Sequence, residues 1–326
     1  MNNKHAVIVD CDPGIDDSLA LLLLLKSPEI NIVGITTVSG NVPAELGAKN
    51  VFKVLKLTDR LDIPVYIGAS NPLTVPYVSA QDTHGDDGLG NSRIPPVKVQ
   101  AKHGAIDFIL RTFQNAPQTE LLVLGPMTNI AMCLRQDPHI FDQTKRLIAM
   151  GGNYASFGNC SPVAEYNFWC DPHAAKEVFT KSHVKIEMVG LDVTRKIVLT
   201  PNILDYIKQV GGPIADFIKK ITRFYIDFHW QQEGLIGCVI NDPLAAACLL
   251  LPDLLSGFAS YTKIAATGIA RGESIVDAHD FWHKKPNSYI YTKVDQKSFW
   301  TLFLSRVIGI SPTEIAKVLV QLGVEL

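Results

Sequence analysis

The sequence predicts an α/β protein with a mainly parallel central sheet, helices on both faces and a small C-terminal antiparallel portion. Short apolar runs alternate with helical patterns through the first two-thirds of the chain. These runs are apolar on both faces, which is typical of strands buried in a parallel sheet. After Thr200 the order changes to long helical patterns and then three strand-like runs. No Pro-, Gly- or Ser-rich linker separates the two parts, so we expect one domain over residues 1–326.

The strands of the parallel part are predicted where apolar and β-branched residues form short runs bounded by turn residues. They are Ala6–Asp10, Ile30–Val38, Pro64–Ile67, Glu120–Leu124, Arg146–Met150 and Val184–Val189. Helices are predicted between them, where apolar residues recur at three- and four-residue spacing. They are Asp16–Lys26, Ala44–Leu57, Ala105–Gln114, Asn129–Arg135 and Pro172–Thr180.

The last third is predicted to add two helices, three short strands and a final helix. These are helices Pro213–Gln232 and Asp242–Leu251, strands Tyr261–Thr267, Glu273–Val276 and Ser288–Val294, and helix Gln296–Val307. The very apolar stretch Leu19–Leu25 lies in an early helix and is too short to span a bilayer, which takes about 20 residues. It therefore predicts a buried helix rather than a membrane anchor.

Charge and cysteine content exclude some partners. The 326 residues carry a net charge of −2 with no long basic run, so no nucleic-acid partner is expected. The six cysteines include no CxxC pair and no signal-peptide pattern precedes the first strand, which favours reduced thiols, a cytoplasmic location and no membrane partner.

An acidic turn follows the first strand. Asp10, Asp12, Asp16 and Asp17 place four carboxylates within eight positions. Two like charges about 4 Å apart repel by about 4 kcal/mol at an effective dielectric constant near 20. Because all the ligands are oxygens, the turn predicts a calcium or magnesium site. The alternative is that Asp16 and Asp17 only cap the helix that starts there.

Polar segments also follow other predicted strands. They are Ser39–Asn41, Gly125–Asn129 and Gly151–Asn153. Parallel sheets bind ligands beyond the carboxyl ends of their strands, so we expect one pocket at that edge.

The segment Asp10–Ser18 closely resembles the N-terminal signature of the nucleoside hydrolases of the inosine–uridine-preferring type. Further segments resemble that family in the same order along almost the whole chain. They are Thr37–Asn41, Thr83–Gly90, Leu124–Asn129, Gly158–Asn167, Asn241–Pro243 and Phe299–Trp300.

This resemblance implies calcium-dependent hydrolysis of the N-glycosidic bond of ribonucleosides by water, in a homodimer or homotetramer. It places Ca²⁺ on the Asp12, Asp17 and Asp242 carboxylates and the Thr128 backbone carbonyl. Asp12 would also be the general base. The ribose hydroxyls would be bound by Asp16, Asn41, Glu165 and Asn167, with Asn159 on the 5′-hydroxyl side.

One position departs from the family. Many members have a histidine directly before the late metal-binding aspartate, and it protonates the leaving base. This chain has Asn241, which can hydrogen-bond but cannot serve as a general acid. His84 and His229 are the alternative residues at the leaving base. Two other functions stay open: a non-catalytic nucleoside- or ribose-binding protein that lost its acid, and a metal-dependent phosphatase built on Asp10 and Asp12.

Overall fold

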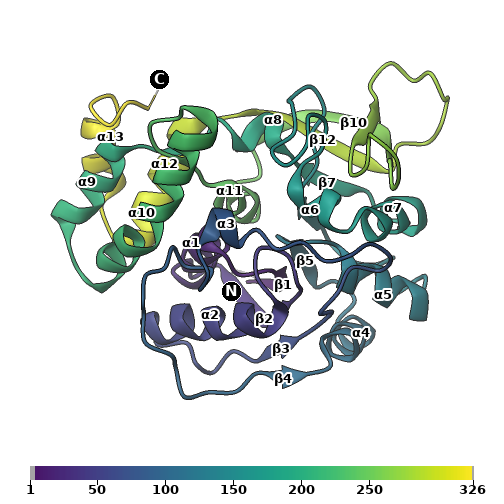
Figure 1. The fold of residues 1–326 in the computed structure, drawn as a ribbon, viewed down its shortest axis with the longest axis horizontal. Helices are drawn as coiled ribbons and strands as arrows, with labels where there is room; N and C mark the ends of the chain where they lie inside the picture. The colour runs from purple at the N-terminus through teal and green to yellow at the C-terminus, as the bar shows by residue number, and fades with distance from the viewer. Residues whose placement is uncertain (1–3, 325–326) are drawn as a thin grey trace.

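The computed structural model describes residues 4–324. Its main sheet has ten strands in the order β11-β10-β12-β7-β6-β5-β1-β2-β3-β4. All neighbours from β12 to β4 pair in parallel, whereas β10 runs antiparallel to β12 and β11. The predicted fold class is therefore confirmed, with the antiparallel portion at one edge of the sheet (Figure 1).

The strands have the following bounds: β1 His5–Cys11, β2 Ile30–Thr37, β3 Val65–Ile67, β4 Lys102–His103, β5 Glu120–Val123, β6 Leu147–Met150, β7 Ile186–Val189, β10 Leu255–Ile264, β11 Ser274–Asp277 and β12 Ser288–Val294. A separate two-stranded sheet pairs β8 Val198–Leu199 with β9 Cys238–Val239. The helices are α1 Ile15–Leu25, α2 Ala44–Leu57, α3 Gln81–His84, α4 Ala105–Asn115, α5 Thr128–Gln136, α6 Tyr166–Cys170, α7 Pro172–Lys181, α8 Leu191–Thr194, α9 Pro201–Val210, α10 Pro213–Glu233, α11 Asn241–Ala247, α12 Gln296–Phe303 and α13 Pro312–Val318.

The core lies on both faces of the sheet. Along β1, Val7, Val9 and Cys11 pack into one hydrophobic cluster, while Ile8 packs into the other. The first cluster includes residues of α1, α2, α10 and α11, and the second includes residues of α4, α5 and α7. Figure 1 shows α4, α5 and α7 together on one side. Because side chains on both faces of β1 meet a helix layer, its central run Val7–Val9 is apolar and buried.

The predicted boundaries differ from the structure mainly after Thr200. Helix α9 was not predicted, although Thr200 accepts a hydrogen bond from the Ile203 amide as its N-cap and a proline follows it. Strand β10 begins six residues before the predicted Tyr261, across a register shift at Ser256/Gly257. The predicted last helix ends as α12 and continues as a π-helical turn over Leu304–Ile308. Within residues 4–324, no helix has both the length and the apolar character needed to cross a bilayer.

Candidate active site

A pocket lies at the carboxyl ends of the parallel strands, at the edge predicted from the polar segments. The space between its walls, counted together with its open mouth, is about 740 Å³. The predicted residues that line it are Asp16, Asn41, His84, Asn159, Glu165, Asn167, His229, Asn241 and Asp242. The other predicted residues, Asp12, Asp17 and Thr128, are buried beside this lining.

The acidic turn is held by backbone hydrogen bonds. The Asp12 amide donates to Asp17 Oδ1 across 3.1 Å, and the Gly14 amide donates to Asp17 Oδ2 across 3.0 Å. Asp17 therefore caps α1 and also faces the other carboxylates. Asp12 Oδ2 accepts from the Asn41 amide at 2.6 Å, which joins the turn to the end of β2. The Asn41 side chain donates to Asp17 Oδ2 across 3.1 Å.

Three carboxylates converge where α1 and α11 begin. Asp16, Asp17 and Asp242 each have an oxygen within 4.8 Å of the other two. Burial and the neighbouring carboxylates raise the pKa of Asp12 and of Asp242 well above the usual range, and raise that of Asp17 to about 6. Asp12 Oδ1 and Asp16 Oδ1 are buried without a hydrogen-bond partner among the described residues. These orphaned oxygens and the repulsion between the carboxylates fit a divalent cation with oxygen ligands.

Glycine permits the close packing around Asp12. A Cβ atom at Gly125 would lie 2.7 Å from Asp12 Oδ1, and one at Gly40 would collide with Asp12 Oδ2. The loops after β5 and β2 can therefore approach this carboxylate only without side chains at these positions. Thr128 is the first residue of α5, and its hydroxyl donates to Asp171 Oδ2 across 2.8 Å.

Asp10 faces away from this group. Its Oδ1 accepts hydrogen bonds from Thr36 Oγ1 and from Asn129 Nδ2. Burial, partly opposed by these two bonds, raises the pKa of Asp10 to about 7. Asp10 thus links β1 to β2 and α5 and helps to hold the acidic turn in place.

The opposite wall is built around Glu165, the N-cap of α6. Its carboxylate accepts from the amides of Gly152, Asn167 and Phe168 at 2.9, 2.9 and 3.2 Å. Burial outweighs these bonds and raises the pKa of Glu165 to about 7. The Asn167 side chain donates to the carbonyl of Leu124 across 2.7 Å. This wall is therefore tied to the ends of β5 and β6.

Asn159 lies at the pocket edge of the same loop. Its Oδ1 accepts from the Tyr166 amide at 2.9 Å, which fixes the side chain. Arg195 lines this part of the pocket and was not predicted. It lies 3.6 Å from the Phe157 ring centroid and donates to the Phe157 and Gly158 carbonyls. Nothing in the local sequence distinguishes Arg195, because its partners come from a loop about 38 positions earlier.

The pocket lining also includes both predicted histidines and Asn241. His84 Nδ1 accepts from the Ile15 amide at 3.1 Å, whereas His229 Nδ1 lies 2.9 Å from the Tyr225 carbonyl. Burial lowers the pKa of both imidazoles. The centroid of the Tyr225 ring lies 5.1 Å from that of His84 and 4.4 Å from that of His229. Tyr225 is buried in the pocket lining, whereas Trp230 on the same helix is 58% exposed.

Comparisons with known proteins identify the family of this chain. The model of the family described as inosine-uridine preferring nucleoside hydrolase matches residues 7–301. The pyrimidine-specific ribonucleoside hydrolase RihA of Salmonella typhimurium is 33% identical over 305 residues, which cover 92% of this chain and 97% of that protein.

Two solved structures share the fold closely. The plant nucleoside hydrolase PpNRh1 has a TM-score of 0.89 at 27% identity, over 94% of this chain and 99% of that one. A purine-preferring ribonucleoside hydrolase from Gardnerella vaginalis has a TM-score of 0.88 at 31% identity, over 93% and 98% of the two chains. The chain therefore belongs to the inosine–uridine-preferring nucleoside hydrolase family, whose members are N-glycosyl hydrolases.

Proposed function

We propose that this protein is a calcium-dependent ribonucleoside hydrolase that splits a ribonucleoside into ribose and free base. The observation that supports this most is the convergence of Asp16, Asp17 and Asp242 beside a pocket at the carboxyl ends of the strands. The pocket is lined by amide and carboxylate groups that suit a ribose.

The cation would be held by Asp12, Asp17, Asp242 and the Thr128 carbonyl. Ca²⁺ accepts six to eight oxygen ligands in a flexible arrangement, which suits a set drawn from distant segments better than the strict octahedron of Mg²⁺. When bound, it would supply Lewis-acid activation of a water and a grip on the ribose diol.

The side chains perform the remaining chemistry. Asp12 takes a proton from the attacking water, whose oxygen bonds to the anomeric carbon as the N-glycosidic bond breaks. Positive charge develops on the ribose ring in this step, as in glycoside hydrolysis. Asp16 and Glu165, with the amides Asn41 and Asn167, stabilise that charge and hydrogen-bond the ribose hydroxyls. Asn159 contacts the 5′-hydroxyl side.

His84 would stabilise the leaving base by donating a hydrogen bond from Nε2, and the departing base would take its proton from solvent. Because His84 Nδ1 accepts the Ile15 amide hydrogen, its neutral form carries the proton on Nε2. His229 has the reverse arrangement, since its Nδ1 donates to the Tyr225 carbonyl and leaves Nε2 as an acceptor. Asn241 would hold Asp16 and contact the base without proton transfer.

The alternative is a nucleoside- or ribose-binding protein without catalysis, and Asn241 is the observation that favours it. A reducing-sugar assay on uridine, cytidine, inosine and adenosine separates the two functions and measures base preference. The proposed enzyme releases ribose from at least one substrate. Asp12→Asn keeps an oxygen that can accept from the Asn41 amide but removes the general base. We therefore expect turnover to fall by a factor of about 100 or more. Exposed Asp205→Asn is the matched control. Ribose binding without turnover on all four substrates would support the alternative.

The oligomeric state and location stay predictions. We propose a homodimer or homotetramer in the cytoplasm. Light scattering coupled to size-exclusion chromatography measures the oligomeric state.

A further inference from the structure

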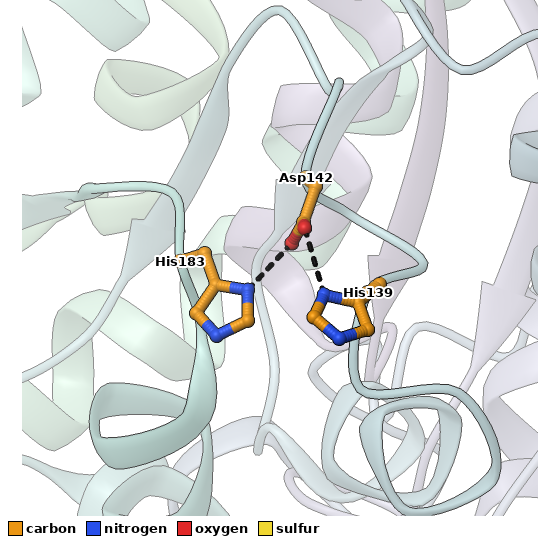
Figure 2. Close-up of side chains that lie close together, drawn as sticks. All are labelled: His139, Asp142 and His183. Carbon is orange, nitrogen blue, oxygen red and sulfur yellow. Dashed lines mark hydrogen bonds and ion pairs between the residues drawn. The ribbon is translucent and has the colours of Figure 1, made fainter.

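A second group of possible metal ligands lies on the surface, away from the pocket. It consists of His139, Asp142 and His183, whose ligand atoms lie within 4.8 Å of one another. Figure 2 shows the two imidazoles approaching the carboxylate from opposite sides. His139 Nδ1 lies 2.9 Å from Asp142 Oδ2, and His183 Nδ1 lies 2.9 Å from Asp142 Oδ1.

Local structure positions two of the three side chains. The His139 amide donates to Asp137 Oδ1 across 3.0 Å, and the Asp142 amide donates to the His139 carbonyl across 3.0 Å. His139 and Asp142 are thus held in one turn between α5 and β6. His183 comes from a different segment, directly between α7 and β7. Two imidazoles 44 positions apart in the sequence therefore converge on one carboxylate, with ring centroids 5.0 Å apart.

The chemistry of the three groups suits a divalent transition metal. Imidazole nitrogen favours Zn²⁺, Ni²⁺ and Cu²⁺, whereas Ca²⁺ and Mg²⁺ favour oxygen alone. Hydrogen bonds from His139 and His183 outweigh burial and lower the pKa of Asp142, so the carboxylate is ionised at neutral pH. In Figure 2 the second ring nitrogen of each histidine points away from Asp142. Each neutral ring can therefore carry its proton there and leave Nδ1 free as a ligand.

We propose that His139, Asp142 and His183 form a binding site for a divalent transition-metal ion such as Zn²⁺. The ion would take the place of the two hydrogens that now lie between the imidazoles and Asp142. The side chains are 72%, 37% and 55% exposed, so water can complete the coordination.

The place of the site in the fold gives the ion a structural role. His139 and Asp142 precede β6, and His183 precedes β7, which pairs in parallel with β6. The site therefore lies at the amino ends of these strands, whereas the pocket lies beyond the carboxyl ends. The ion would join the two segments that lead into β6 and β7. Since the unfolded chain does not hold these ligands together, binding stabilises the folded protein. This proposal does not depend on the proposed function.

The test is calorimetric titration of the full-length protein with Zn²⁺, with excess Ca²⁺ present to occupy the carboxylate site. One zinc equivalent should bind, and His139→Ala, His183→Ala and Asp142→Asn should each weaken it about tenfold or more. His283→Ala is the matched control, because His283 forms a surface pair with Asp280 at 3.4 Å. It should leave zinc affinity unchanged.

Two further readouts separate this site from the pocket. Zn²⁺ should raise the melting temperature of the wild type but not of the His139→Ala/His183→Ala double variant, which should retain wild-type nucleoside cleavage. Because both histidines are exposed, the double variant is expected to fold. Equal zinc affinity in the wild type and the double variant would overturn the proposal, and so would an Asp142→Asn variant that binds zinc as tightly as the wild type.

Discussion

The Asn241 side chain donates a hydrogen bond to Asp16 Oδ2 across 3.1 Å, joining two residues 225 positions apart. Asp16 Oδ1 and Asn241 Oδ1 are both buried without a partner among residues 4–324. Asn241 therefore holds one oxygen of Asp16 and leaves the other available to a ligand. Under the proposed function, this arrangement would let Asn241 position Asp16 without any proton transfer.

Asn241→His tests whether the missing acid limits the reaction. A histidine here can still donate to Asp16 and can also protonate the leaving base. We expect kcat for the slowest purine ribonucleoside to rise about tenfold, with little change for a substrate that already reacts fast. Steady-state kinetics on inosine, adenosine and uridine measure this. If no purine nucleoside is cleaved faster, Asn241 is not the limiting group.

Loss of the 2′-hydroxyl should slow the reaction strongly. The proposed site holds the ribose diol with the cation and with Asp16 and Asn41, and a deoxyribose leaves these groups buried and unpaired. We expect kcat/KM for a 2′-deoxyribonucleoside to be lower than that for the matching ribonucleoside by a factor of about 100 or more. Comparable rates for uridine and 2′-deoxyuridine would contradict this mode of ribose binding.

Removal of the cation should abolish activity and destabilise the fold. Without it, the buried carboxylates of Asp12, Asp17 and Asp242 repel one another. Dialysis against a chelator should stop ribose release, and Ca²⁺ should restore it better than Mg²⁺. At 100 times its dissociation constant, Ca²⁺ should add about 2.7 kcal/mol to the free energy of unfolding. Full activity in the chelated protein would refute calcium dependence.

Glu165 should contribute to the pH dependence of the free energy of unfolding. Its pKa is about 7 in the folded protein against an ordinary value of 4.5, because it is buried. Between these values the folded protein binds a proton that the unfolded chain has released. The free energy of unfolding should therefore fall as pH rises from about 4.5 to about 7, by about 3 kcal/mol from this group.

Urea unfolding of the wild type and Glu165→Gln, both with chelator at pH 5 and pH 7.5, measures this contribution. The glutamine does not titrate, so the variant should lose less stability between the two pH values. Other buried carboxylates titrate in both proteins and cancel in the comparison. An equal loss in both would show that Glu165 is not protonated in the folded state.

The sequence predicted the parts of the site that depend on local patterns. Asp12 and Asn41 follow buried strands, so their edge of the sheet follows from the parallel topology, whereas Glu165 was predicted only from the resemblance to the family. Contacts between distant segments left no such signal. Three features depend on tertiary packing and cannot be read from any local pattern. They are the Asn241–Asp16 hydrogen bond, the Arg195 contacts with the carbonyls of residues 157–158, and the opposite hydrogen-bond roles of His84 and His229. The short strands β4, β8 and β9 were missed because two residues give no periodicity.

The distance along the chain between the acidic turn and Asp242 also has a consequence for synthesis. The ribosome adds about 5 to 20 residues per second, so Asp242 follows Asp17 by about 10 to 45 s. During that interval the N-terminal strand and turn exist without their last carboxylate partner. A nascent or truncated chain that ends before α11 lacks one of the proposed calcium ligands, so full cation affinity would require a chain that includes α11.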